Sequence, residues 1–121
     1  MDTHALVWWL NDSPRLSSSA KAAMRDSAND LLVSAIVAYE IAYKERSGRM
    51  PLIAANLPRQ LRHERIGILP ITLDHALAAA ALSGPHRDPW DRIMIAQAQA
   101  EQLSVVTVDH VFSDYGVPVV W

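Results

Sequence analysis

One stretch, from Arg87 to Asp109, constrains the fold more than any other part of the chain; it reads RDPWDRIMIAQAQAEQLSVVTVD. Asp88 followed by Pro89 has the pattern of a helix N-cap with proline at the first helical position. The residues that follow predict a mostly apolar helix, and Val105–Val108 predicts a buried β-strand. A helix that leads into such a strand is half of a βαβ unit. Ligands of open α/β sheets bind outside the carboxyl ends of strands, which is where Asp109 is expected.

Short apolar segments alternate with amphipathic segments along the whole chain. Glycine and proline in two of the expected strands place these two at sheet edges. The alternation predicts an α/β fold, with a mostly parallel sheet and helices on both faces. The expected strands are Leu31–Val33, Ile66–Ile71, Val105–Val108 and Val117–Val120. The expected helices cover residues 5–10, 20–27, 34–46, 51–65, 72–83 and, after Asp88, most of 89–100. Ser34 and Thr72 are expected to cap the helices that begin at them, and Gly48 to end the helix over 34–46.

Length and composition restrict the possible classes of protein. The 121 residues predict a single domain spanning 1–121, and half of them are apolar. The absence of cysteine excludes disulfides and thiolate metal sites. No apolar run approaches the roughly 20 residues of a membrane span, and no signal peptide is visible, so we expect a cytoplasmic protein with no membrane partner. The net charge of −2 gives no basic surplus for nucleic acid, although a nuclease can bind phosphate through metal ions.

Three acids lie at related positions. Asp109 follows a predicted strand, Glu40 lies on the helix after Leu31–Val33, and Asp91 lies in the first turn of the helix before Val105–Val108. Asp2 would be a fourth acid of this kind if a strand preceded it. Converging carboxylates without thiolates suit a hard cation such as Mg²⁺ or Mn²⁺. Such ions activate water, stabilise charge on a phosphoryl group and reverse the sign of an acidic site.

Each of these acids also has a purely structural interpretation. Asp88 is then only a helix cap, and Asp91 only a first-turn acid favoured by the helix dipole. Glu40 lies among apolar residues, where a carboxylate is uncommon unless it is paired or bound to a metal. Its alternative is a surface ion pair with Lys44, four residues further on. The basic residues near position 60 (Arg59, Arg62, His63 and Arg65) are either a solvated face or a phosphate-steering patch.

Four motifs, taken in order, resemble the PIN-domain ribonucleases, and within them the VapC toxins of toxin–antitoxin modules. Each motif alone is weak, but their order and separations are fairly specific, and together they cover nearly the whole chain. They are Asp2-Thr3-His4-Ala5-Leu6, the segment Ser34–Glu40, Asp88-Pro89-Trp90-Asp91-Arg92, and Thr107-Val108-Asp109.

The resemblance implies a PIN-like α/β/α sandwich and a Mg²⁺-dependent endoribonuclease, with Mn²⁺ as a possible substitute. In this chemistry a metal-activated water attacks an RNA phosphodiester without a covalent enzyme intermediate. The implied partners are RNA, a second copy in a homodimer and a cognate VapB-type antitoxin. The implied residues are Asp2, Glu40, Asp91 and Asp109 as metal ligands, Asp88, Thr107 and Thr3 as supporting residues, and Arg92, otherwise a surface helix residue, as a contact for RNA or antitoxin.

The chain departs from the family pattern at its start. In the family the first aspartate ends a central strand of several apolar residues, whereas here only Met1 precedes Asp2. Either the start codon is placed too late, the chain is truncated, or the fold manages without that strand. We expect a truncated first strand and a native reading frame that extends upstream, and this makes Asp2 the least secure member of the acidic cluster.

Two rival functions were weighed. An aspartyl-phosphate hydrolase needs a second aspartate two residues after the first; this position holds His4, and no lysine lies near Thr107 or Asp109, so we rank it low. A non-catalytic PIN-like module that binds nucleic acid or protein is the main alternative, although the intact acid set speaks against it. Structural roles are favoured for several other polar and aromatic residues: hydrogen-bonded packing for His4 and His86, and core or dimer contacts rather than base stacking for Trp8, Trp9 and Trp90.

Overall fold

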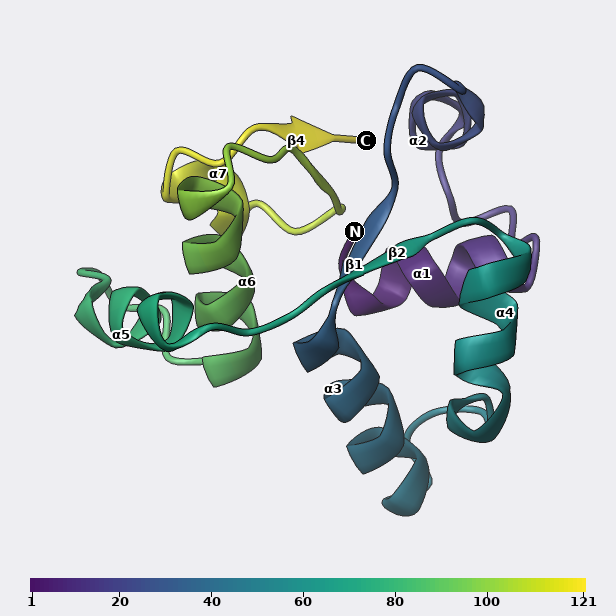
Figure 1. Cartoon of the computed structure of the whole chain (residues 1–121), viewed down its shortest axis with the longest axis horizontal. Helices are drawn as coiled ribbons and strands as arrows, with labels where there is room; N and C mark the ends of the chain where they lie inside the picture. Colours follow the sequence, from purple (N-terminus) through teal and green to yellow (C-terminus); the bar gives the residue numbers. More distant parts are fainter.

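Strands and helices alternate in the computed structural model, which describes residues 1–121. Figure 1 shows α5, α6 and α7 on one side of β1 and β2, α1, α2 and α4 on the other, and α3 below. The elements in chain order are α1 (Thr3–Leu10), α2 (Ser18–Arg25), β1 (Leu32–Ser34), α3 (Ala35–Arg46), the 3₁₀ helix η1 (Ala54–Asn56), α4 (Leu57–His63), β2 (Gly67–Leu69), α5 (Leu73–Ala81), α6 (Pro89–Ala100), β3 (Val105–Val106), α7 (Val111–Asp114) and β4 (Val119–Val120).

Side-chain caps determine where most of the long helices begin. The predicted caps Ser34, Thr72 and Asp88 are confirmed, because each side chain accepts a hydrogen bond from a backbone N–H of the following turn. The prediction that Gly48 ends α3 also agrees with the structure, since α3 stops at Arg46 and Gly48 has a φ of +70°.

The strands pair in parallel, as predicted, but they form two two-stranded sheets rather than the one central sheet that we expected. Leu32 of β1 lies opposite Gly67 of β2, and Val105 of β3 lies opposite Val119 of β4. β3 also ends earlier than predicted: Val108 lies outside it and is 50% exposed.

Met1 and Asp2 lie between the two sheets, where Figure 1 places the N-terminus. The terminal amine of Met1 donates to the carbonyl of Leu32 in β1 (3.2 Å), and the backbone N–H of Asp2 donates to the carbonyl of Val106 in β3 (3.0 Å). These two residues thus contact one strand of each sheet. Asp2 has an extended backbone and is the N-cap of α1.

The main hydrophobic core lies between α3, α6 and the strands. Its fully buried side chains include Val37 and Ile41 of α3, Ile95 of α6 and Phe112 of α7. A smaller cluster joins α1 and α2 to β3 and contains Ala5, Leu16, Ala20, Met24 and Val106. Packing of these apolar faces, rather than the very short strands, orients the helices that carry the acids.

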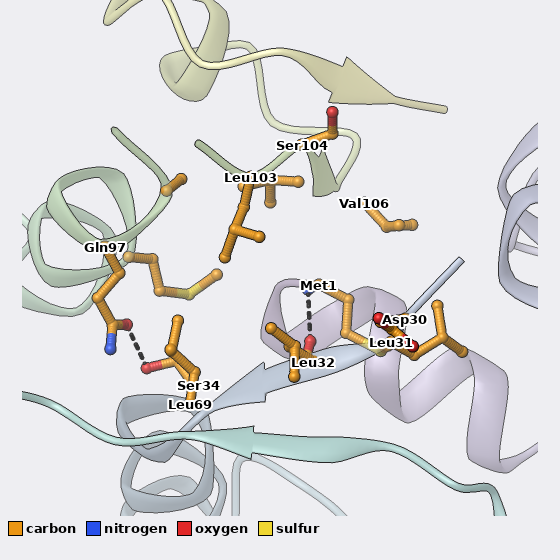
Figure 2. Close-up of a pocket in the computed structure, with 13 residues that line it drawn as sticks. Met1, Asp30, Leu31, Leu32, Ser34, Leu69, Gln97, Leu103, Ser104 and Val106 are labelled. Atoms are coloured by element: carbon orange, nitrogen blue, oxygen red, sulfur yellow. Dashed lines mark hydrogen bonds between the residues drawn. The ribbon is translucent and has the colours of Figure 1, made fainter. Parts of the chain in front are cut away.

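An apolar pocket opens between the two sheets and one face of α6 (Figure 2), and Met1, Leu31 and Leu103 are part of its lining. At its side the Ser34 hydroxyl donates to Oε1 of Gln97 at 2.5 Å. The Gln97 side chain is fully buried, and its Nε2 donates to the carbonyl of Pro70 at 3.1 Å. One amide of α6 therefore holds the ends of both β1 and β2.

None of the helices combines the length and the apolar composition that crossing a membrane requires.

Replacing Gln97 with methionine should destabilise the protein, because it keeps the volume but removes both buried hydrogen bonds of the amide. We expect the free energy of unfolding, measured by urea denaturation, to fall by about 1–3 kcal/mol. Gln99→Met is the matched control, since Gln99 lies on the same helix and its one hydrogen bond, to the carbonyl of Tyr115, is exposed to water; it should cost less than about 0.5 kcal/mol. Equal losses in the two variants would contradict the bridging role of Gln97.

Candidate active site

Five carboxylates from separate parts of the chain line one polar pocket. Three come from the N-termini of two helices (Asp2 at α1, Asp88 and Asp91 at α6), one from the middle of α3 and one from the segment after β3. The structure thus brings together the four predicted metal ligands and the supporting Asp88. The residues that line the pocket are Asp2, Thr3, His4, Glu40, Lys44, Asp88, Asp91, Met94, Val108 and Asp109.

Thr107 links the two acids that are most distant in the sequence. Its hydroxyl donates to Oδ2 of Asp2 and accepts from the backbone N–H of Asp109 at 2.9 Å. The other oxygen of Asp2 caps α1 by accepting from the N–H of Ala5 at 2.7 Å. Asp2 is only 8% exposed and Thr107 is fully buried, so both are held firmly. Thr107 is therefore a positioning residue for this end of the pocket.

Glu40 points into the pocket from α3 and is 8% exposed. The hydroxyl of Thr3 donates to its Oε2, and the ammonium of Lys44 forms an ion pair with its Oε1. The i,i+4 pair that we considered as the structural alternative is thus present, but it is partly buried and lies in the pocket rather than on an outer face. Lys44 is the only lysine or arginine in the pocket lining.

Asp88 and Asp91 lie one turn apart at the start of α6. Oδ1 of Asp88 accepts from the N–H of Trp90 at 2.9 Å, so Asp88 is a helix cap that also lines the pocket. Oδ2 of Asp91 lies 2.9 Å from Nε2 of His86. Burial raises the pKa of Asp91 to about 6; the hydrogen bond with His86 opposes this rise, and the negative charges of Asp88 and Asp109 add to it.

The donor set fits a hard divalent cation, because all five acids of the lining offer carboxylate oxygens and no thiolate is present. As the side chains stand, no group of three acids or histidines is close enough to hold one ion. Glu40 is occupied by Lys44 and Asp91 by His86. Binding of a cation therefore requires these two carboxylates to turn away from their present partners.

Arg92 lies behind the pocket rather than in its lining. Its guanidinium donates to the carbonyls of Ala79 (3.1 Å), Leu82 (2.6 Å) and His86 (2.9 Å). These bonds satisfy carbonyls at the end of α5 and hold the following loop, which carries His86, against α6. Arg92 thus has a positioning role, and a contact with RNA or an antitoxin stays a prediction.

The sequence alone did not predict the roles of two residues in the site, Lys44 and His86. The sequence suggests Lys44 only as a surface partner of Glu40, whereas the structure places it in the pocket lining as the one lysine or arginine there. The spacing of four residues from Glu40 is the sequence feature that indicates their contact. His86 was favoured as a structural histidine, and it does form a hydrogen bond, but its partner is the site acid Asp91. Its position five residues before Asp91 does not reveal this contact, which depends on the loop after α5.

Asp91→Asn should stabilise the metal-free protein at neutral pH. The folded-state pKa of about 6 lies above the ordinary value of 3.8, so the folded protein binds this proton more tightly than the unfolded chain does. The stability contributed by the protonated carboxyl is full below pH 4 and is lost as the pH rises to about 6. We expect the variant to gain about 1–3 kcal/mol at pH 7.5 and nothing at pH 4.

Urea denaturation in EDTA across this pH range measures the difference. Asp114→Asn is the matched control, because Asp114 is an exposed acid at the end of α7, outside the pocket. A wild-type protein as stable as the Asp91 variant at pH 7.5 would show that the charge of Asp91 is not disfavoured by its surroundings.

Comparison with known proteins identifies the family. The model of the PIN domain family matches residues 1–118. The chain is similar to ribonuclease VapC22 of Mycobacterium tuberculosis (strain H37Rv), with 32% identity over 116 residues, which cover 90% of this chain and 85% of that protein. Its fold is similar to that of a chain in a toxin–antitoxin complex from Klebsiella pneumoniae, with a TM-score of 0.66, 23% identity and coverage of 99% of this chain and 93% of that one. The α/β fold and the resemblance suggested by the four motifs are thereby confirmed, and the chain belongs to the PIN domain family, with a VapC ribonuclease among its relatives.

Proposed function

We propose that this protein is a metal-dependent endoribonuclease and the toxin of a toxin–antitoxin module. The observation that carries the proposal is the convergence of five carboxylates from four separate segments in one pocket. Burying carboxylates close together costs stability: burial raises the pKa of Asp91 to about 6, and the charges of Asp88 and Asp109 add to this rise. A purely structural pocket has no need of such an arrangement. The similarity to ribonuclease VapC22 supports the same activity.

Mg²⁺, or Mn²⁺ in its place, is the proposed cofactor. Asp2, Asp91 and Asp109 would hold it, with Glu40 completing the set. When bound, the cation supplies the positive charge that lets an anionic phosphodiester approach and activates water for hydrolysis.

The protein's own residues prepare this site. Thr107 fixes the orientation of Asp2, and Thr3 fixes that of Glu40, so two carboxylates are positioned before any ligand enters. Asp91 has to lose its proton to act as a ligand, and its raised pKa makes this step easiest above pH 6. Met94 and Val108 form the apolar part of the lining.

We further propose that the protein forms a homodimer and is inhibited by a cognate VapB-type antitoxin. The structural neighbour was solved as a toxin–antitoxin complex, which supports a partner of this kind for the same fold. The alternative function is a PIN-like module that binds nucleic acid or protein without cleaving RNA. The observation in its favour is that no three side chains are close enough to ligate an ion as they stand.

Purified protein should cleave single-stranded RNA in Mg²⁺ or Mn²⁺ and should be inactive in EDTA. Asp109→Asn should lower kcat by about 100-fold or more, because it removes one of the few groups that stabilise charge in the reaction. Asp109 is exposed, so the variant should fold normally. Gel analysis of labelled RNA measures cleavage, and Asp114→Asn, outside the pocket, should retain activity.

A second readout tests the metal separately from cleavage. Mg²⁺ should raise the Tm of the wild-type protein, since a ligand that binds only the folded state stabilises it, and Asp109→Asn should reduce this shift. Equal cleavage in EDTA, or by the variant, would contradict the metal mechanism. A Mg²⁺-dependent shift together with RNA binding but no cleavage would favour the non-catalytic alternative.

A further inference from the structure

Three aromatic rings form an exposed surface beside the acidic pocket, which we call the ring surface: Tyr39 and Tyr43 of α3 and Trp90 of α6. Tyr39 is 56% exposed and Tyr43 is 49% exposed. Their rings are stacked, with centroids 6.1 Å apart and an interplanar angle of 22°. The Trp90 ring is tilted against both, at 6.4 Å from Tyr39 and 5.7 Å from Tyr43. Trp90 is half-buried and lies outside both hydrophobic clusters, so of the two contacts expected for it the core contact is not found, and the dimer contact stays a prediction.

Two cations lie over these rings. Nζ of Lys44 is 5.5 Å from the centre of the Trp90 ring, and Cζ of Arg49 is 5.5 Å from the centre of the Tyr43 ring. Lys44 also lines the acidic pocket. A continuous path therefore leads from the carboxylates over Lys44 and Trp90 to Tyr43 and Arg49, with two aromatic rings between two cations.

We propose that the ring surface binds unpaired bases of single-stranded RNA next to the phosphodiester in the acidic pocket, and that Lys44 and Arg49 contact the flanking phosphates. This inference rests on the proposed ribonuclease function and specifies the form of its substrate. Surfaces that bind single strands combine aromatic faces, on which bases stack, with positive charges that follow the backbone. Duplex RNA does not offer free base faces, so it should gain nothing from the rings.

The charges near the rings favour RNA over a protein partner. The chain carries a net charge of −2, and five acids line the pocket. These negative charges repel an approaching RNA strand unless positively charged groups near the pocket contact its phosphates. Lys44 provides such a charge in the pocket lining, and Arg49 provides one over the Tyr43 ring. Their position over ring faces also matches the cation–π contacts that accompany base stacking.

Binding of RNA in EDTA, where cleavage is prevented, tests the inference. The probe is a fluorescein-labelled single-stranded RNA oligonucleotide of mixed sequence, alone or annealed to its complement, and the readout is fluorescence anisotropy. The double variant Tyr39→Ala/Tyr43→Ala should bind the single strand at least about tenfold more weakly than the wild type. The matched control Tyr39→Phe/Tyr43→Phe keeps the rings and should bind within about twofold of the wild type, on the scale of a small surface change.

The phosphate contact proposed for Arg49 is tested by the salt dependence of RNA binding. Arg49→Ala should reduce the slope of log Kd against log salt concentration by about 0.7, the contribution of one phosphate contact on a single strand. Arg25→Ala is the control, because Arg25 is an exposed arginine on α2, away from α3 in Figure 1, and it should leave the slope unchanged. An unchanged slope in the Arg49 variant would contradict its phosphate contact.

Several outcomes would overturn the proposed base stacking. Unchanged affinity of the alanine variant, an equal loss in the phenylalanine variant, or an equal loss for duplex RNA would each do so. A change of oligomeric state in size-exclusion chromatography, with RNA affinity unchanged, would assign the rings to a protein interface instead.

Cleavage kinetics separate failure of this inference from failure of the proposed function. If the wild type cleaves RNA in Mg²⁺ and the alanine variant has the same KM, the ring surface is not a substrate site but the ribonuclease proposal stands. If the wild type binds RNA through the rings but does not cleave it, the ribonuclease proposal fails and the RNA-binding surface remains.

Discussion

The buried hydroxyl of Thr107 connects the beginning of the chain to the segment that follows β3, and the acidic pocket depends on this connection. It binds the carboxylate of Asp2 and the backbone of Asp109, two residues at nearly opposite ends of the sequence. The backbone bond from Asp2 to Val106 reinforces the same contact. Core packing orients α1 and α6, and the Thr107 hydroxyl then fixes Asp2 at the N-terminus of α1 next to the segment that carries Asp109.

Holding the acids together opposes their mutual repulsion, and the protein offsets this with specific partners. Glu40 has Thr3 and Lys44, Asp91 has His86, and Asp2 has Thr107 and a helix N-terminus. The compensation is incomplete, as the raised pKa of Asp91 indicates. Lys44 and His86 are basic groups beside the carboxylates that we propose as metal ligands. Lys44 and His86, which stabilise the free protein, therefore compete with a divalent cation for the same carboxylate oxygens.

Local features of this fold were predictable from the sequence, and long-range features largely were not. The caps Ser34, Thr72 and Asp88 act within one turn, so their residue types identify them. The convergence of Asp91 and Asp109 followed from their positions at ends of predicted elements, and that of Glu40 from its place among apolar residues on the helix after a predicted strand, whereas Asp2 was assigned only through the family resemblance. The division into two sheets, the Gln97 bridge, the loop contacts of Arg92 and the exposure of the ring surface all depend on tertiary packing. Spacing along one chain does not encode which distant backbone groups or rings a side chain will meet.

The central claim is that Asp2, Asp91 and Asp109 bind one divalent cation in the pocket where these segments meet. Anomalous diffraction from crystals of the protein grown or soaked with Mn²⁺ locates such an ion directly. The account predicts an anomalous peak inside the acidic pocket, within ligand distance of carboxylate oxygens from these residues, with Lys44 and His86 displaced from Glu40 and Asp91. A pocket without a peak at saturating Mn²⁺, or a peak only at surface acids elsewhere, would contradict it.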